Sequence, residues 1–143
     1  MTSFMPDPHN LARFLSAQAP AIEQVLGELR AGWKRGHWMW FVFPQIAGLG
    51  QSEMAQRYAI ASLDEARAYL ANGILGARLK ECVALVVAVE GKTVHEIFGY
   101  PDDLKFRSSL TLFARAAPQE KIFRDALQKY FAGEEDKATL ERI

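Results

Sequence analysis

The sequence predicts an all-α fold, namely a single compact orthogonal helical domain of about seven helices that spans residues 1–143. Helix start and stop residues recur along the chain, with proline or a small polar residue before each apolar stretch and glycine after it. Within these stretches apolar residues are spaced three and four apart, the period of an amphipathic helix. No Asn-Gly or Asp-Gly pair separates two alternating runs, so β-hairpins are not predicted.

The first two helices are predicted from their proline residues. Asp7-Pro8 is typical of an N-cap followed by proline at the first helical position, and Pro20 begins the second helix. Gly32 and Gly36 bracket the end of the second helix. Its apolar face has the spacing i, i+3, i+4, i+7 and i+11, with Ile22, Val25, Leu26, Leu29 and Trp33.

The next stretch, residues 36–50, is the one around which we expect the rest of the chain to fold. Trp38, Trp40, Phe41 and Phe43 lie within six residues and cannot all face one side of a regular element. The segment must therefore be covered on more than one face. Its conformation is either a buried helical turn or a short extended piece, and both a pocket wall and a plain core fit the pattern.

The middle of the chain continues with capped helices. Ser52 can cap a helix after the glycine-containing loop, and Ser62 with Glu65 forms a capping box for a helix that runs to about residue 71. Residues 75–89 carry a long apolar stripe and are predicted to form the central, nearly buried helix. Their β-branched residues leave a strand as the alternative. A second capping box, Thr93 with Glu96, begins a short helix.

The last third of the chain is predicted to form two long helices and a short or frayed one. Pro101 begins the first, and its inward face carries Phe106, Leu110, Phe113 and Ala117. Pro118 marks the start of the second, which ends at Gly133.

Composition limits the classes of function. Seventeen basic residues balance seventeen acidic ones, which gives no general electrostatic reason to expect binding to nucleic acid or to an anionic membrane. The longest apolar run, residues 83–89, is far too short to span a bilayer, and the N-terminus has no signal-peptide pattern. Cys82 is the single cysteine, so no internal disulfide is possible; we expect a cytoplasmic protein with an inert buried thiol.

No motif for a metal or a cofactor is present. His9, His37 and His95 lie far apart, and none belongs to a spacing that is typical of metal ligands. The run Ala47-Gly48-Leu49-Gly50 lacks the third glycine of a dinucleotide-binding loop. We therefore predict neither a metal nor a resident cofactor.

The first candidate site lies in the aromatic stretch. His37 stands beside Trp38 and Trp40, and Gln45 follows across Pro44. An imidazole and a carboxamide that flank aromatic rings could hold a planar ring or the edge of a sugar. The alternative is structural: His37 caps the preceding helix, and Gln45 satisfies loop amides.

The second candidate site lies on one stripe of the helix that begins at Pro101. Lys105, Ser108 and Arg115 share this stripe, away from the phenylalanine face, and Lys105 with Ser108 could contact a phosphate. The alternative is a solvated helix face. A third, weaker candidate is the helix start at Ser52, which could attract an anion or could simply be a capped helix.

These motifs resemble a bacterial family catalogued as domain of unknown function 1810. The resemblance covers nearly the whole chain and rests on several segments. They are His37 to Gln45, Gly48 to Gly50, Ser52 to Met54, Tyr58 to Ile60, Glu65 to Leu70, Leu75-Gly76, Arg78-Leu79, Ile97 to Gly99, Asp102 to Lys105 and Ser108 to Phe113.

The resemblance implies a mainly α-helical fold and no established activity. Members are sometimes labelled "calpastatin", but such inhibitor repeats are polar and disordered, whereas half of this chain is hydrophobic. The family is also distantly similar to helical NADAR domains, which implies chemistry on NAD or ADP-ribose. That likeness concerns the fold and does not assign an activity.

Two hypotheses for the function follow. In the first, the protein binds or processes a nucleotide or ADP-ribose-like ligand. Trp38, Trp40, Phe43 and Gln45 then form the ring site, Lys105 and Ser108 bind phosphate, and His37 is the candidate acid or base. In the second, it is a non-catalytic interaction module or a small homodimer with an exposed apolar patch near the glycine-containing loop. Whether the protein is an enzyme is left open.

Overall fold

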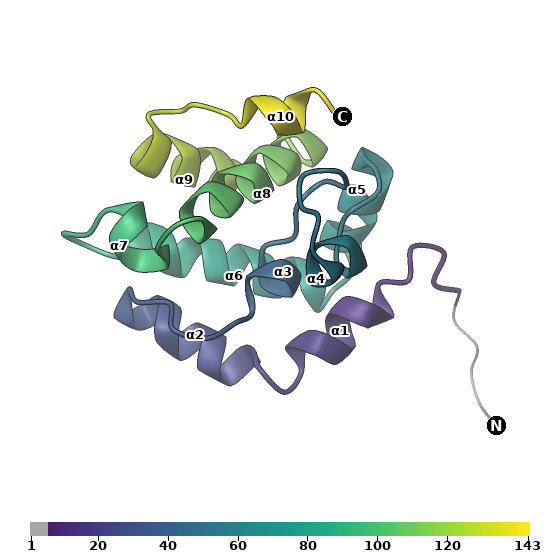
Figure 1. The fold of residues 1–143 in the computed structure, drawn as a ribbon, viewed down its shortest axis with the longest axis horizontal. Coiled ribbons are helices and arrows are strands. Elements are labelled where there is room, and N and C mark those ends of the chain that lie inside the picture. The colour runs from purple at the N-terminus through teal and green to yellow at the C-terminus, as the bar shows by residue number, and fades with distance from the viewer. Residues whose placement is uncertain (1–5) are drawn as a thin grey trace.

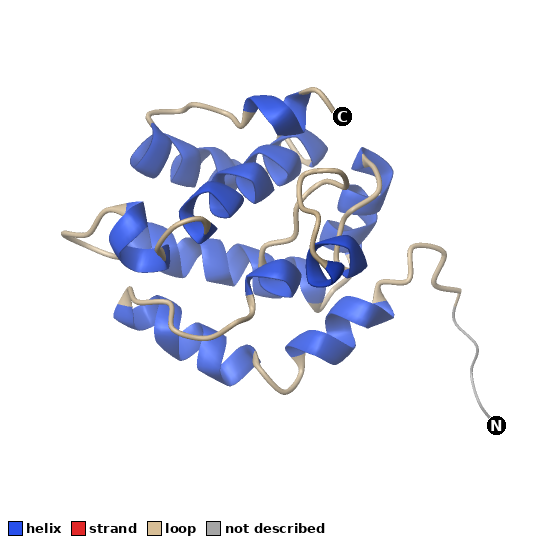
Figure 2. Ribbon diagram, in the orientation of Figure 1, coloured by secondary structure: helices blue, strands red, loops and turns tan. Residues whose placement is uncertain are grey.

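In a computed structural model, residues 6–143 form ten helices joined by loops (Figures 1 and 2). No strand forms in this range, although Ile46 and Ile60 make an isolated parallel bridge. The helices are α1 (Ala12–Gln18), α2 (Ile22–Ala31), α3 (Met39–Val42), α4 (Glu53–Arg57), α5 (Leu63–Ala71), α6 (Leu75–Ala88), α7 (Val94–Phe98), α8 (Asp102–Ala116), α9 (Lys121–Phe131) and α10 (Lys137–Leu140).

The all-α prediction is confirmed, but the number of helices is larger than the seven or so predicted. Four of the helices, α3, α4, α7 and α10, have only four or five residues each. Of these, α3 is the one whose conformation the sequence left open. A helix of one turn has too few residues to repeat an apolar face, so its period cannot be recognised in a sequence. Within residues 6–143 no helix combines the length and the hydropathy of a membrane span.

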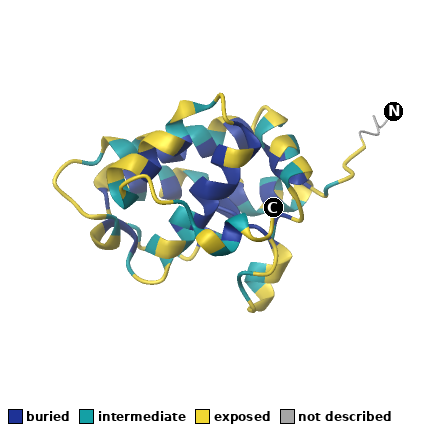
Figure 3. Cartoon of the chain, turned by 90° about the horizontal axis from the view of Figure 1, so that it is seen from above, coloured by how far each residue is buried: buried dark blue, intermediate teal, exposed yellow. Residues whose placement is uncertain are grey.

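Helices α6 and α8 form the centre of the molecule (Figure 1). Helix α6 packs on α2, α5 and α9, and α8 packs on α5, α7, α9 and α10. The sequence predicted α6 to be the central helix, yet α8 is more enclosed. Nine of the fifteen residues of α8 are buried, against six of fourteen in α6. Figure 3 shows this buried interior beneath a surface that is mostly intermediate or exposed.

Hydroxyl groups on α8 can be buried because backbone atoms pair with them. Ser108 Oγ donates to the Leu104 carbonyl at 3.2 Å, and Thr111 Oγ1 donates to the Arg107 carbonyl at 2.8 Å. Thr111 Oγ1 also accepts a hydrogen bond from the Asp136 N–H at 2.8 Å. The hydroxyl-rich stretch thus holds the segment before α10 against α8.

The two predicted capping boxes differ in the structure. Thr93 and Glu96 exchange both hydrogen bonds of the box at the start of α7. Ser62 Oγ accepts from the Glu65 N–H at the start of α5. The Glu65 carboxylate, however, lies 2.8 Å from the guanidinium of Arg13 in α1. Glu65 therefore connects α5 to α1, in addition to donating its N–H to the Ser62 cap.

The aromatic stretch lies inside the fold and is covered on more than one face, as its composition predicts. It contains the single turn α3, so the buried helical turn is the conformation it adopts, and Ile46 after it forms the isolated bridge with Ile60. The Phe43 ring lies 5.0 Å from Phe106 and 5.9 Å from Phe98, centroid to centroid, and 6.1 Å from Trp38. These rings join the stretch to α7 and α8.

Trp33 does not belong to the buried face of α2, contrary to the sequence prediction. Helix α2 ends at Ala31, and Gly32 takes a left-handed conformation with a φ of 70°. The reversal of the chain at Gly32 removes Trp33 from the helical stripe, and 56% of its surface is exposed. The Arg35 guanidinium lies over its ring, 4.8 Å from the centroid.

Candidate functional site

Two cavities share Gln45 and Gly50 in their walls. The first has a volume of about 150 Å³ and is closed by Trp40 and by residues 55–59 in and after α4. The second has a volume of about 230 Å³ and lies between the loop that follows α3, helix α8 and the start of α10. Together they approach the lower end of the ~300–1,000 Å³ that is typical of small-molecule sites.

The loop between the cavities has a defined shape. The Ala47 N–H donates to the Ile60 carbonyl and the Ile60 N–H donates to the Gln45 carbonyl, both at 2.8 Å. Gly48 has a φ of 98°, which favours glycine. A Cβ on Gly50 would lie 2.5 Å from the Cβ of Ala55. These two glycines therefore let the chain turn and pass close to α4.

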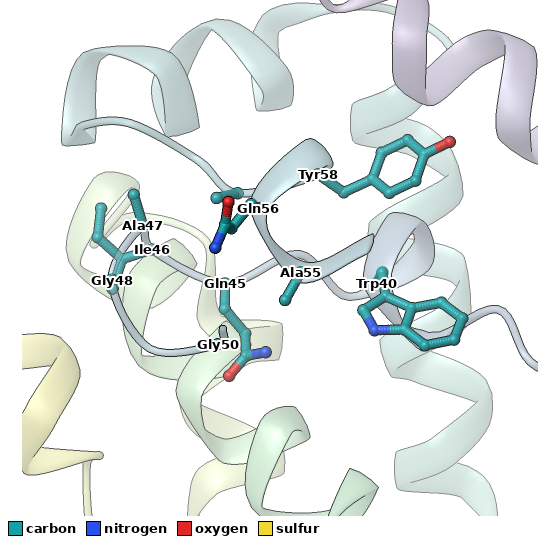
Figure 4. A pocket seen from close by; sticks show the side chains of 10 residues that line it. Trp40, Gln45, Ile46, Ala47, Gly48, Gly50, Ala55, Gln56 and Tyr58 are labelled. Atoms are coloured by element: carbon teal, nitrogen blue, oxygen red, sulfur yellow. The ribbon is translucent and has the colours of Figure 1, made fainter. Parts of the chain in front are cut away.

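The first cavity combines an aromatic ring with carboxamide groups and contains no charged side chain. Within residues 6–143, neither the Trp40 indole N–H nor the Gln45 carboxamide forms a hydrogen bond. Figure 4 shows the indole nitrogen on the edge of Trp40 that faces Ala55 and Gln45, with the Tyr58 hydroxyl directed away from them. The cavity thus offers unpaired donors and an acceptor beside an aromatic ring.

The second cavity contains a cation. The Lys105 ammonium lies 5.7 Å from the centroid of the Trp40 ring and 3.6 Å from Oδ1 of Asp102. It donates no hydrogen bond to any residue in the described part of the chain. The other oxygen of Asp102 lies 2.8 Å from the ammonium of Lys34, which is only 7% exposed. One carboxylate therefore faces two lysines.

Ser108 lines the second cavity, but its hydroxyl proton is directed to the Leu104 carbonyl. In this rotamer the hydroxyl offers the cavity an acceptor, so it would have to rotate to donate to a phosphate. Asp136 is also in the wall, where it caps α10 by accepting from the Thr139 N–H and lies 3.8 Å from Arg107. That pairing leaves Lys105 as the cation that defines the charge of the cavity.

Four of the residues expected at the site therefore come together, from two separate segments of the chain, residues 36–50 and α8. Trp40 and Gln45 line the first cavity, and Gln45, Lys105 and Ser108 line the second. The family resemblance led us to expect the first and second candidate sites to lie close together. Gln45 lines both cavities and connects them.

Three other expected residues lie elsewhere. Trp38 and Phe43 are 2% and 1% exposed, so their rings belong to the core and do not form a cavity wall. The Trp38 N–H donates to Glu28 at 3.0 Å, which fixes the ring to α2. His37 is exposed and lines neither cavity. A solvent-exposed imidazole outside the cavities has no geometric basis for the acid or base role considered for it.

Several residues of the site were missed by sequence reasoning. Ala55 and Gln56 of α4 line the first cavity, while Asp136 and Ala138 near the C-terminus line the second. The Ser52 capping pattern predicted α4, the helix that carries Ala55 and Gln56. No comparable sequence pattern connects the C-terminal segment with residues some ninety positions earlier, because that contact depends on the path of the chain around α8.

The titratable groups outside the cavities have structural roles. Cys82 is 1% exposed, and burial raises the pKa of its thiol to about 12, so the thiol stays protonated at neutral pH. Among residues 6–143, no three His, Cys, Asp or Glu side chains gather where they could hold a metal ion. The chemistry offered by the cavities is therefore aromatic stacking, carboxamide hydrogen bonding and attraction of an anion.

Comparisons with known proteins agree with this fold. The chain is similar to a crystallised conserved hypothetical protein, Rv1873, from Mycobacterium tuberculosis, with 57% sequence identity and a TM-score of 0.94. That alignment covers 94% of this chain and 96% of the other. No significant match is found among curated proteins.

The family model described as "Protein of unknown function (DUF1810)" matches residues 8–143. This match includes every residue of the two cavities and nearly all of the helical fold. The chain therefore belongs to the DUF1810 family.

Proposed function

We propose that this protein binds a small phosphorylated ligand with a planar ring, of the nucleotide or ADP-ribose class, in the two cavities that share Gln45. The observation that carries the proposal is the convergence of Trp40, Gln45 and Lys105. Each of these side chains has polar groups without a hydrogen-bond partner in residues 6–143, and Lys105 lies on α8, far along the sequence from Trp40 and Gln45.

The two cavities fit different parts of such a ligand. The first is uncharged and contains carboxamides, so it suits the edge of a base or another planar amide. The second contains the Lys105 ammonium and suits a phosphate, since a charge-assisted hydrogen bond is about twice as strong as a neutral one. Because the cavities share Gln45 and Gly50, one ligand with both parts could occupy them together.

The site supports binding more directly than catalysis. His37 lines neither cavity, and the carboxylates of Asp102 and Asp136 are paired with cations. No group in the cavities is arranged as a nucleophile with an adjacent base. We therefore propose a ligand-binding protein and assign no reaction.

The proposal is tested by a thermal-shift and calorimetry screen with AMP, ADP, ADP-ribose, NAD, adenosine and inorganic phosphate. A ligand at a hundred times its dissociation constant stabilises the folded state by about 2.7 kcal/mol, which raises the Tm of a domain of this size by several degrees. Lys105→Gln should weaken the binding of the phosphorylated ligands by about tenfold, because the one cation among the described residues that line the second cavity is lost.

The matched control is Lys80→Gln on α6. Lys80 is 42% exposed and lies 3.4 Å from Glu120, outside both cavities. The Lys80→Gln variant should bind every ligand as the wild-type protein does. Absence of any thermal shift in the well-folded wild-type protein would exclude this ligand class, and equal losses in the two variants would exclude Lys105 as the phosphate contact.

A second candidate function is a non-catalytic interaction module or a small homodimer. It is favoured by exposed apolar side chains at the start of α8: Leu104, which lines the second cavity, is 42% exposed, and Tyr100, which precedes Pro101, is 75% exposed. Sedimentation of the wild-type protein over a range of concentrations separates the two functions. Association that depends on concentration, together with no ligand binding in the screen, would favour the module.

A further inference from the structure

Lys34, Asp102 and Lys105 form a group of charges in which the Asp102 carboxylate lies close to two ammonium groups. Asp102 Oδ2 lies 2.8 Å from the Lys34 ammonium, and Asp102 Oδ1 lies 3.6 Å from the Lys105 ammonium. Two lysines and one aspartate leave a formal charge of +1 on the group. Asp136 in the wall of the same cavity is paired separately with Arg107, which also lies 3.9 Å from Glu134.

The two lysines are held very differently. The Lys34 ammonium donates to the Gly36 carbonyl at 2.6 Å, lies 4.9 Å from the centroid of the Trp38 ring, and is almost enclosed. Lys105 is 27% exposed, and its distance to Asp102 exceeds that of a hydrogen bond. Lys34 is therefore the permanent partner of Asp102, whereas Lys105 is held weakly and can leave.

We propose that Asp102 is a positioning residue whose carboxylate competes with the anionic group of a ligand for Lys105. This inference rests on the function proposed above. In the absence of a competing anion, Asp102 draws the ammonium toward the start of α8. When a phosphate binds, Lys105 turns to it, and Asp102 does not become an unpaired charge because Lys34 neutralises it. Asp102 thus sets the affinity for the anion without contacting it.

The proposal predicts an increase in affinity on removal of a side chain near the site. Asp102→Asn keeps an oxygen that can accept a hydrogen bond from Lys34 but removes the charge that competes for Lys105. It should bind AMP about two- to fivefold more tightly than the wild-type protein at 0.15 M salt, the range expected for a partly exposed ion pair. Its affinity for adenosine, which carries no anion, should be unchanged.

Asp103→Asn is the matched control, because it removes the same charge from the next residue of α8. Asp103 contacts the exposed ring of His95 at 3.3 Å and has no contact with either lysine. This variant should keep the wild-type ratio of AMP affinity to adenosine affinity. Equal tightening in Asp102→Asn and Asp103→Asn would attribute the effect to net charge and overturn the proposal.

A second variant tests the same competition from the other side. Lys34→Gln leaves Asp102 with Lys105 as its one remaining cation, so the ratio of AMP affinity to adenosine affinity should fall. A merely structural effect would change both affinities together. Circular dichroism and the Tm report whether each variant is folded. If Asp102→Asn does not fold, the ratio of AMP affinity to adenosine affinity in Lys34→Gln tests the proposal alone.

The outcomes distinguish this inference from the function on which it rests. A wild-type protein that binds neither AMP, adenosine nor inorganic phosphate overturns both. A wild-type protein that binds AMP through Lys105, with Asp102→Asn and Lys34→Gln leaving the ratio unchanged, overturns the role of Asp102 alone. Tighter AMP binding in Asp102→Asn together with a lower ratio in Lys34→Gln establishes the competition.

Discussion

At the scale of single residues, similar side chains have different roles because their surroundings differ. Trp38 and Trp40 stand two positions apart, yet Trp38 is buried with its N–H bonded to Glu28, while Trp40 lines a cavity. Trp38 is the N-cap residue of α3 and Trp40 lies within this turn. Because successive residues of a helix differ in direction by about 100°, two positions turn the rings to different sides. Composition alone assigned both to the same wall.

Glu28 is the residue that holds the loop after α2 in place. One of its oxygens accepts hydrogen bonds from the Arg35 and Gly36 N–H groups at 2.7 and 2.9 Å, as well as from Trp38. Partial burial raises the pKa of this carboxyl, but the hydrogen bonds, including one from Gln24, outweigh burial and lower the pKa from 4.5 to about 2. The folded protein therefore binds this proton more weakly than the unfolded chain does.

This shift predicts the pH dependence of stability. Because the pKa of Glu28 is lower in the folded state, its contribution is present above about pH 4.5 and is lost as the pH falls toward 2. Glu28→Gln should be less stable at neutral pH and should show a smaller further loss between pH 4.5 and 2. Urea denaturation across this range measures both effects. Glu53→Gln, at a carboxyl that is 86% exposed, should behave as the wild-type protein does.

At the scale of elements, helix contacts decide which sequence changes are tolerated. Only residues 72–74 separate the end of α5 from the start of α6, and the two helices are in close contact at Gly76. A Cβ at this position would lie 2.1 Å from the Leu70 carbonyl oxygen, which belongs to the backbone and cannot move freely. Gly27 in α2, by contrast, has no atom within 4 Å of the position of a Cβ.

The two helical glycines should therefore respond to alanine in opposite ways. Gly76→Ala should destabilise the protein by at least about 2 kcal/mol, because the two helices must separate to admit the methyl group. Gly27→Ala should stabilise it by about 0.5–1 kcal/mol, because alanine loses less backbone entropy in a helix. Chemical denaturation of both variants measures the difference. A neutral Gly76→Ala would show that α5 and α6 are less closely packed than described.

At the scale of the whole molecule, Arg13 joins the N-terminal helix to the part of the chain that surrounds the first cavity. Its guanidinium donates to the Arg57 and Ala59 carbonyls at 2.9 and 2.8 Å and to the Glu65 carboxylate at 2.8 Å. Glu65 is 6% exposed, so this carboxylate depends on its partner for solvation. The ion pair fixes α1 against the chain between α4 and α5.

Arg13→Lys should lower the free energy of unfolding by about 2–3 kcal/mol, because a single ammonium cannot replace the planar group that reaches three segments. Arg67→Lys is the control, since Arg67 and Asp64 form a pair that is more than half exposed and contributes little. Equal stabilities of the two variants, measured by urea denaturation, would contradict the conclusion that Arg13 fixes α1 against the chain between α4 and α5.

Local patterns determined much of the fold. The caps Ser52, Ser62 and Thr93 predicted the starts of α4, α5 and α7, and the spacing of apolar residues predicted the longer helices, because capping and amphipathic periodicity depend on residues three or four positions apart. The same reasoning left the conformation of α3 open and placed Trp33 on a buried face that ends at Gly32. A backbone reversal at one glycine is a local event, but its effect on the next side chain depends on what packs there.

The candidate site, like the fold, was predicted only in part from the sequence. Residue type and local spacing were sufficient to mark Trp40, Gln45 and Lys105 as candidates, since ligand sites combine aromatic walls with a few polar groups. Which of them share a cavity, and that Trp38 and Phe43 lie in the core, was decided by packing between α3, α4 and α8. The pairing of Asp102 with Lys34 and the contribution of Asp136 from the C-terminus were likewise decided by tertiary structure. Such contacts join residues tens of positions apart, and no period in the sequence encodes a distance between them.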